Sequence, residues 1–279
     1  MTSKNDSDAE KLIWKALQEQ VHNRTYRLID NTDKSGGGTA VAIKMGNNFF
    51  LLTAKHVIEN DHDMEVLVRD QDVTGVSKFL ARHTKEDADV GLIELDPNDS
   101  HLFVFATQTS LCPINDKKWD SCVLVCGYPG QLIHPIGYEA LSDGSQIQYN
   151  KCDSFTLRTI AVPPSEWIKD WPGEDGTPLH LDPAHDLLVE FQPEGKIIME
   201  GPNNCGITES PIVGDNYPSP QGMSGGGMWQ AVVNNSNGIL KPDARLLALQ
   251  VAVWNGYFRG ILIQVWLDLI RDRYPDLKC

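Results

Sequence analysis

Apolar residues recur with a helical period near both ends of the chain and in short runs between those ends. Residues 8–22 carry an apolar stripe at helical spacing, and residues 263–274 predict a second helix that ends before Pro275. Short β-rich runs separated by turn residues occupy most of the middle. The pattern predicts a chain dominated by β-strands, with one helix near each end. The first helix either packs on the domain or binds a partner, and packing is the expectation.

Two apolar runs, 38–44 and 48–53, flank a Gly46-Asn47 turn and predict a β-hairpin. Further strands are expected at 24–29, 64–68, 77–83, 89–95, 147–162 (two strands), 186–191 and 245–254. Residues 163–185 differ from these runs because they are rich in proline and acidic side chains. They predict a long surface loop, which either caps a functional cleft, binds a regulator or has no functional role.

Composition and charge limit which kinds of function the chain is expected to have. The chain of 279 residues, 41% of them hydrophobic, can bury the core of one large domain or two small ones. Its formal net charge of −14 would repel phosphate backbones, so we do not expect a nucleic-acid partner. No apolar run reaches the ~18 residues that a membrane helix requires. The polar, acidic N-terminus lacks the pattern of a secretory signal, so we expect a cytoplasmic protein that does not enter a membrane.

The six cysteines are expected to be free thiols, because the cytoplasm keeps cysteines reduced. No Cys-x-x-Cys pair occurs, so the sequence predicts no zinc site. Buried structural cysteines are therefore the expectation.

One glycine-rich stretch carries candidate chemistry: Gly222-Met223-Ser224-Gly225-Gly226-Gly227. Glycine lets backbone amides approach a reacting atom closely and adopt positive φ. A serine held on such a turn can attack a carbonyl while nearby amides bind the developing oxyanion. The alternative interpretation is a flexible glycine–serine loop without chemistry.

Two earlier segments favour the chemical interpretation. His56 follows the apolar run 49–52, and Asp89 opens a second apolar run, so the chain order is His, Asp, Ser. This is the order of the chymotrypsin-type triad. Gly222-x-Ser224-x-Gly226 also matches the nucleophile elbow of α/β-hydrolases, but that fold requires a histidine after the serine. All eight histidines precede Ser224, so the order excludes the elbow.

The motifs "TAKHV", "DVGLIEL" and "GMSGGG" together resemble those of the trypsin-like serine peptidases. The segments "GGGTAVAIKMGNNFFLLTAKHV" and "WDSCVLVCGYPG" resemble the HtrA-like, bacterial cytoplasmic branch, here without a PDZ domain. The resemblance implies a chymotrypsin-like, all-β fold of two six-stranded antiparallel β-barrels. It divides the chain into an N-terminal helical extension (1–35) and a peptidase domain (36–274). Within that domain it places a first barrel at 36–112, a second at 119–262 with the inserted loop 163–185, and a C-terminal helix at 263–274.

The resemblance also implies the roles of the site residues. Ser224 would be the nucleophile, His56 the general base and Asp89 the residue that orients the imidazole. The amides of Gly222 and Ser224 would form the oxyanion hole. Asp87 and Asp186 remain alternative acids, and the mechanism requires no metal or cofactor.

The same resemblance also implies which substrates are cleaved and how the activity is controlled. Pro218, Trp254 and Gly256 would line the pocket for the substrate residue that precedes the cleaved bond. Pro218 stands where members that cleave after lysine or arginine carry an acid, so this pocket is expected to take a neutral, apolar or small residue.

Met223 occupies the position of an aspartate that in digestive members pairs with a newly cleaved N-terminus, and no activation sequence precedes the domain. Activity is therefore expected without N-terminal processing, either constitutively or under the control of a protein partner. The leading hypothesis is a regulated serine endopeptidase acting on protein or peptide substrates. The alternative is a catalytically silent binding module on the same fold.

Overall fold

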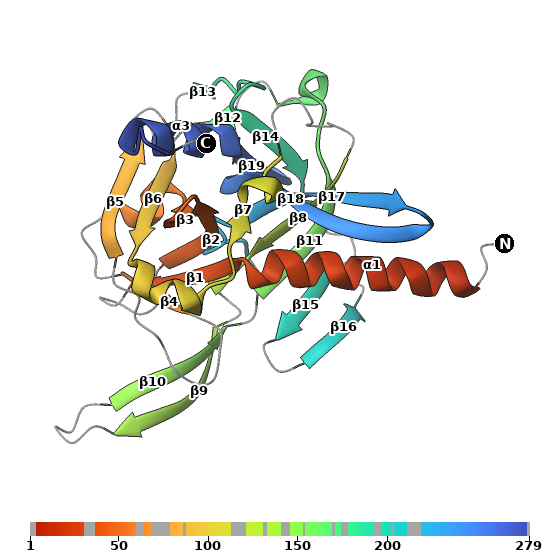
Figure 1. Cartoon of the computed structure of the whole chain (residues 1–279), viewed down its shortest axis with the longest axis horizontal. Coiled ribbons are helices and arrows are strands. Elements are labelled where there is room, and N and C mark those ends of the chain that lie inside the picture. The colour runs from red at the N-terminus through yellow and green to blue at the C-terminus, as the bar shows by residue number, and fades with distance from the viewer. Residues whose placement is uncertain are drawn as a thin grey trace.

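The structure is a computed structural model in which two antiparallel β-sheets dominate and a helix lies near each end of the chain (Figure 1). It describes residues 4–30, 37–59, 64–67, 79–85, 88–112, 121–130, 133–140, 146–152, 154–168, 171–173, 178–191, 197–201, 204–210 and 219–277. The N-terminal helix is α1 (Lys4–Asn23), and the C-terminal helix is α3 (Ile263–Arg273). None of the helices in this described part of the chain has both the length and the apolar character needed to cross a bilayer.

The first sheet has the strand order β4-β1-β2-β3-β6-β5, with β7 parallel to β2. Its strands are β1 (Thr25–Asp30), β2 (Gly37–Met45), β3 (Asn48–Thr53), β4 (Met64–Leu67), β5 (Phe79–Lys85), β6 (Val90–Leu95) and β7 (Ala106–Thr107). The order β4-β1-β2-β3 is that of a Greek key. The predicted hairpin is β2–β3, and Gly46 in its turn has a φ of +60°.

The second sheet has the order β14-β19-β18-β17-β8-β11-β15-β16. Its strands are β8 (Cys122–Gly127), β11 (Ser154–Ile160), β14 (Asp186–Glu190), β15 (Ile197–Gly201), β16 (Asn204–Ser210), β17 (Gly227–Ser236), β18 (Ile239–Trp254) and β19 (Tyr257–Leu262). A bridge between Ala161 and Val189 and a hydrogen bond from the amide of Val162 to Leu188 O (2.9 Å) join the end of β11 to β14. These contacts close β8, β11, β14, β17, β18 and β19 into a barrel with the same cyclic strand order as the first sheet.

The remaining elements are short or project from the two sheets. They are the strands β9 (Ile133–Ala140), β10 (Gln146–Cys152), β12 (Trp171–Pro172) and β13 (Pro178–Leu179), the helix α2 (Lys55–Ile58), and the 3₁₀ helices η1 (Pro97–Leu102), η2 (Gln108–Ser110) and η5 (Pro164–Glu166). The β9–β10 hairpin points away from the body of the molecule (Figure 1). The architecture confirms the predicted all-β, chymotrypsin-like fold class with a helix near each end.

The two sheets share one hydrophobic core, which fixes the junction between them. Its fully buried members include Leu52 and Leu92 from the first sheet and Leu124 and Trp229 from the second. Trp266 of α3 lies in the same core, and its indole N–H donates to Thr53 O (3.3 Å) and Gly91 O (3.1 Å). Helix α3 therefore ties the second barrel to the two strands that flank the histidine and aspartate of the sequence motifs.

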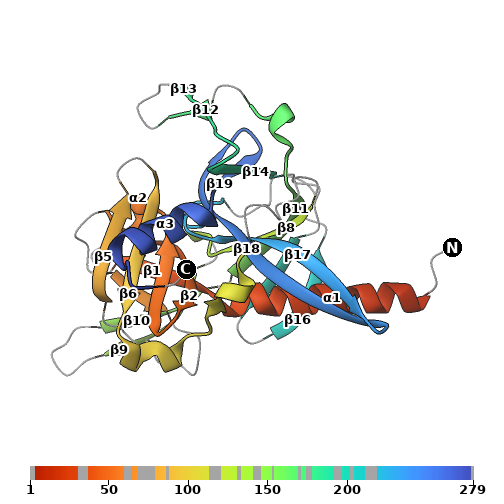
Figure 2. The same cartoon turned by 45° about the horizontal axis from the view of Figure 1, so that its top comes forward.

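Helix α1 lies along the second sheet, and its N-terminal half extends beyond the body of the molecule beside the β17–β18 hairpin (Figure 2). The carboxamide of Gln20 donates to Pro242 O (3.1 Å) and accepts from the amide of Ala244 (2.9 Å). The buried Leu17 and Val21 add apolar contacts to the shared core. The helix therefore packs on the domain along its C-terminal half.

Several elements depart from the sequence expectations. The first sheet begins at β1, N-terminal to the predicted start of the barrel at residue 36, because Tyr26 and Leu28 alternate into the core. Strand β18 has 16 residues and begins well before the predicted 245, and β9, β15 and β16 were not expected. Within residues 163–185, Trp171 is buried with Val162 and Leu188, so part of the predicted surface loop packs as a small apolar cluster.

Candidate active site

His56 and Asp89 lie at the ends of two paired strands and are joined by two hydrogen bonds. Strand β3 ends at Thr53, which pairs with Gly91 of β6, so the register brings the residues just beyond these positions together. His56 Nδ1 lies 2.7 Å from Asp89 Oδ2, and the backbone amide of His56 donates to Asp89 Oδ1 at 3.0 Å. A carboxylate oxygen only accepts, so Nδ1 carries the hydrogen of this pair. In the neutral imidazole the lone pair is then on Nε2, as a general base requires.

Asp186, the alternative acid, has different partners. It is 4% exposed on β14, and its Oδ1 accepts from Nε (2.9 Å) and Nη2 (2.8 Å) of Arg259 on β19. Its Oδ2 accepts from the amide of Asp182 at 2.8 Å. The carboxylate of Asp186 is therefore paired within the second barrel, as a buried charge needs to be. Asp87 lies outside the described residues.

Ser224 lies on a tight loop, residues 219–227, which we call the nucleophile loop after the role that the sequence predicts for Ser224. The backbone of this loop is bonded to both barrels. The carbonyl of Ser224 accepts from the amide of Thr39 on β2 (2.8 Å). On the other side, the amide of Gly225 donates to Gln250 O (2.7 Å), and the amide of Gln250 donates to Gly226 O (2.8 Å). The loop is thus held between β2 of the first barrel and β18 of the second.

The N–H groups of Gly222 and Ser224 are oriented by hydrogen bonds to the carbonyl oxygens of the residues that precede them. Gln221 O accepts from the amide of Gly130 (2.7 Å), and Met223 O accepts from the amide of Gly226 (2.7 Å). In a trans peptide the N–H points opposite to the C=O, so these two bonds orient the N–H groups of Gly222 and Ser224. Within the described part of the chain, neither of these two amides has a protein acceptor. Two oriented N–H groups that lack an acceptor among the described residues, one of them the serine's own, therefore lie at this turn.

The nucleophile loop and the histidine segment meet at Gly38 of β2. A Cβ at Gly38 would lie 2.7 Å from the side chain of Val57 and 3.0 Å from the carbonyl oxygen of Ser224. The residue that follows His56 and the backbone of Ser224 therefore contact the same glycine. The structure brings the His56–Asp89 pair and the nucleophile loop to one junction between the two barrels.

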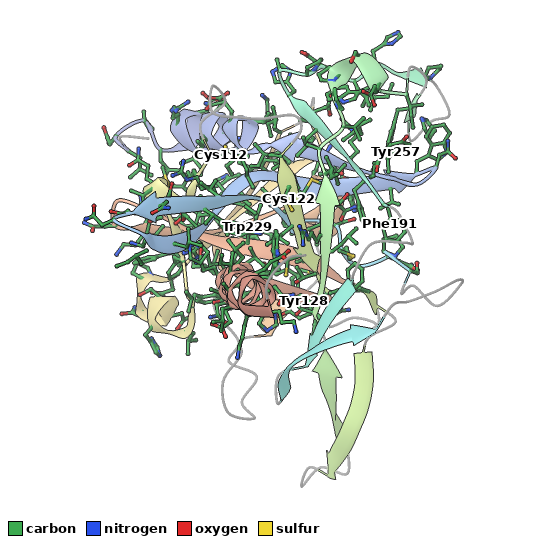
Figure 3. All side chains as sticks on the ribbon, turned by 90° about the vertical axis from the view of Figure 1, so that its right-hand side faces the viewer. Cys112, Cys122, Tyr128, Phe191, Trp229 and Tyr257 are labelled. Carbon is green, nitrogen blue, oxygen red and sulfur yellow. The ribbon has the colours of Figure 1, made fainter. Side chains whose placement is uncertain are left out.

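The predicted pocket residues are placed only in part. Trp254, at the end of β18, is 37% exposed, and its ring centroid is 5.8 Å from that of Trp171 in the insertion. Gly256 has a φ of +79°, and a Cβ there would meet no atom closer than 4.0 Å. Tyr257, which follows it, lies at the end of the molecule that carries the insertion (Figure 3). Pro218 lies outside the described residues.

The described residues contain no group of three or more histidine, cysteine, aspartate or glutamate side chains that could hold a metal ion. The described cysteines Cys112, Cys122 and Cys126 form no disulfide. The side chains at this junction that can take part in acyl-transfer chemistry are those of Ser224, His56 and Asp89.

Gly225 is the position where the loop tolerates a side chain least. Its φ is +88°, and a Cβ there would lie 1.9 Å from Thr39 O and 2.4 Å from Thr53 Oγ1. We expect Gly225→Ala to lower the free energy of unfolding by more than the about 1–3 kcal/mol of a strained backbone alone, because β2 and β3 would have to separate from the loop. Urea unfolding measures the loss. The matched control is Gly238→Ala, since Gly238 has a φ of +80° and no atom within 4 Å of its Cβ. Equal losses in the two variants would contradict the tight packing of this loop.

Comparisons with known proteins give structural neighbours only. No protein-family model matches the sequence, and no curated protein matches it significantly. Solved structures similar to this chain include a variant of the HtrA-type protease AlgW with a tripeptide, at 12% identity over 92% of this chain (TM-score 0.49), and AlgW with a tripeptide, at 13% identity over 93% (TM-score 0.48). The matches cover 62% of each AlgW chain.

A third structure similar to this chain is the protease domain of MamO from Magnetospirillum magneticum in its apo form, at 11% identity. The match covers 89% of this chain and 96% of the MamO chain, with a TM-score of 0.48.

Proposed function

We propose that the protein is a serine endopeptidase in which Ser224, His56 and Asp89 form the catalytic triad. The observation that carries the proposal is the double hydrogen bond between His56 and Asp89, at 2.7 and 3.0 Å, beside a glycine-rich loop that presents a serine. A carboxylate that accepts hydrogen bonds from both the ring and the backbone amide of a histidine fixes the imidazole in one tautomer and one orientation. General-base catalysis requires this.

The proposed reaction is acyl transfer through a covalent intermediate. Ser224 Oγ attacks the carbonyl carbon of a substrate peptide bond while Nε2 of His56 takes the hydroxyl proton. The carbonyl oxygen becomes an oxyanion that the amides of Gly222 and Ser224 stabilise. His56 then gives its proton to the leaving amine, and a water molecule hydrolyses the acyl-enzyme by the same proton transfers in reverse order.

The exposed end of β18 supports an extended peptide as the substrate. In the described residues β17 pairs with β18 only from Ser236↔Ile239 to Gly227↔Leu249, whereas β18 continues to Trp254. Beyond a bulge at Val251, residues 252–254 pair with β19, and no other described strand pairs with them on the opposite side. A substrate segment added to the other side would gain main-chain hydrogen bonds next to the nucleophile loop.

We propose that the enzyme is active without N-terminal cleavage. Met223 is 1% exposed and packs against Gly127, where a Cβ would lie 3.2 Å from the methionine side chain. Its apolar side chain anchors the nucleophile loop in a separate hydrophobic cluster of the second barrel, which includes Val125 and Phe258, without a buried ion pair. Activation by a newly formed N-terminal amine is therefore not part of this proposal, and a protein partner, where one acts, adjusts the rate of a chain that already reacts alone.

Cleavage of a mixed peptide library tests the proposal. We expect the wild-type chain to hydrolyse peptides and Ser224→Ala to leave them intact. The sites should carry neutral, apolar or small residues before the cleaved bond, because Pro218 supplies no charge and Gly256 leaves open space. Cleavage dominated by lysine or arginine would contradict this pocket. Peptides that bind but are never cleaved would contradict the peptidase and favour a silent binding module.

A further inference from the structure

One buried hydroxyl connects the nucleophile loop to the turn that leaves β8. Thr39 is fully buried on β2, and its Oγ1 donates to Gly222 O at 2.9 Å. The amide of Tyr128 donates to the same Oγ1 at 3.0 Å. An amide can only donate and a carbonyl can only accept, so the single hydroxyl proton is committed to Gly222. The Thr39 side chain therefore has one possible arrangement of hydrogen bonds.

The backbone of Thr39 holds the same loop at a second point. Its amide donates to Ser224 O (2.8 Å), and its carbonyl accepts from Thr53 Oγ1 (2.7 Å). Thr39 thus donates hydrogen bonds to the carbonyl oxygens of both Gly222 and Ser224. These are the two residues whose amides have no protein acceptor in the described part of the chain. Fixing these carbonyls holds the peptides 222–223 and 224–225, which flank the peptide that carries the Ser224 amide, and the first of them adjoins the peptide that carries the Gly222 amide.

The turn at Tyr128 is itself fixed by hydrogen bonds to strand β1 and to the nucleophile loop. Its carbonyl accepts from Arg27 Nη1 (3.1 Å), and its hydroxyl donates to Thr25 O (3.3 Å), both on β1. Two residues later, the amide of Gly130 donates to Gln221 O (2.7 Å), which orients the N–H of Gly222. The turn therefore links β1 to the first of the two unpaired amides.

We propose that Thr39 is a positioning residue for the oxyanion hole: its hydroxyl joins the Tyr128 turn to Gly222 and so aligns the Gly222 and Ser224 amides. The inference rests on the proposed peptidase function. Thr39 itself does not touch the reacting atoms. Without its hydroxyl, Gly222 O loses a half-buried hydrogen bond and the Tyr128 amide loses a buried one, so both groups turn towards other partners. The peptides that carry the two amides then rotate away from the direction that a developing oxyanion needs.

A fluorophosphonate probe on the full-length chain tests this positioning role without knowledge of the substrate. The variants are Thr39→Val, which keeps the shape and removes the hydroxyl, and Thr39→Ser, which keeps the hydroxyl. The matched control is Thr159→Val, because Thr159 Oγ1 also donates to a main-chain carbonyl, Glu190 O, but lies on β11 away from the loop. We measure kinact and KI separately, together with the melting temperature.

We expect Thr39→Val to lower kinact about 10- to 100-fold, since loss of one oxyanion donor outright costs more than misalignment. KI should stay unchanged, Thr39→Ser should restore kinact, and Thr159→Val should react like the wild type. If the valine variant does not fold, Thr39→Ala compared with Thr39→Ser isolates the hydroxyl. Equal kinact with and without the hydroxyl would overturn the inference and leave the peptidase proposal standing. A wild-type chain that does not react would overturn both.

Discussion

Replacing His56 with alanine is expected to lower kcat for peptide hydrolysis about 10⁵- to 10⁶-fold. The hydroxyl of Ser224 is a weak nucleophile until a base takes its proton, and the imidazole that Asp89 holds at 2.7 Å is the base that the structure offers. The measurement is the initial rate on the best-cleaved peptide of the library. Ser224→Ala should cost about as much, and the double variant should cost no more than either single one, since the residues act as a unit.

The control for this variant is His101→Ala. His101 is exposed on η1, and its Nδ1 bonds to Asn98 O at 2.8 Å, so the change removes a bonded histidine outside the site. It should leave kcat unchanged. A small loss in His56→Ala, comparable to that in His101→Ala, or losses that add in the double variant, would contradict the role of His56 as the base.

Asp89→Asn is expected to lower kcat about 10⁴-fold while the chain remains folded. The backbone amide of His56 requires an acceptor at the position of Oδ1, so the asparagine carbonyl oxygen would stay there. Its NH₂ group would then face Nδ1, which would have to accept, and the ring hydrogen would move to Nε2. An imidazole in this tautomer cannot take the proton of Ser224. Steady-state kinetics measure the loss, and ¹⁵N chemical shifts of the ring report the tautomer.

Asp186→Asn separates this catalytic effect from a loss of stability. Asp186 is bonded to Arg259 at 2.8 Å and is 4% exposed, so removing its charge leaves a poorly paired guanidinium in the second barrel. The melting temperature should fall, while kcat per folded molecule should stay at the wild-type value. A kcat that depends on Asp186 and not on Asp89 would contradict the assignment of the triad acid.

The sequence predicts the fold class well because local pattern and turn chemistry agree over much of the chain. The apolar runs around Gly46 predict the β2–β3 hairpin almost residue for residue, and the stripe in residues 8–22 predicts most of α1. The prediction is less accurate where long-range pairing decides the result. The first five residues of β18, 239–243, are exposed or half-buried, and they form a strand because β17 pairs with them out to Ser236.

Sequence motifs predict some residues of the candidate site. They cannot predict a residue whose role depends only on its contacts in the folded chain. His56 and Asp89 stand in recognisable motifs, and the register of β3 and β6 brings them together. Thr39 looks like any polar strand residue, since nothing local shows that its hydroxyl meets Gly222 and Tyr128. The same holds for Trp171, whose burial against the end of β18 depends on residues far away in the chain.

The most direct test of the central claim, that His56 and Asp89 activate Ser224 as a nucleophile, is to locate the covalent adduct of a fluorophosphonate probe. Ser224 Oγ would displace fluoride from phosphorus, and its proton would pass to His56. The wild-type chain is exposed to the probe, digested, and mapped by tandem mass spectrometry beside His56→Ala. The account predicts a single adduct on Ser224 that His56→Ala does not form. An adduct on another residue, an adduct formed equally without His56, or no adduct at all would contradict it.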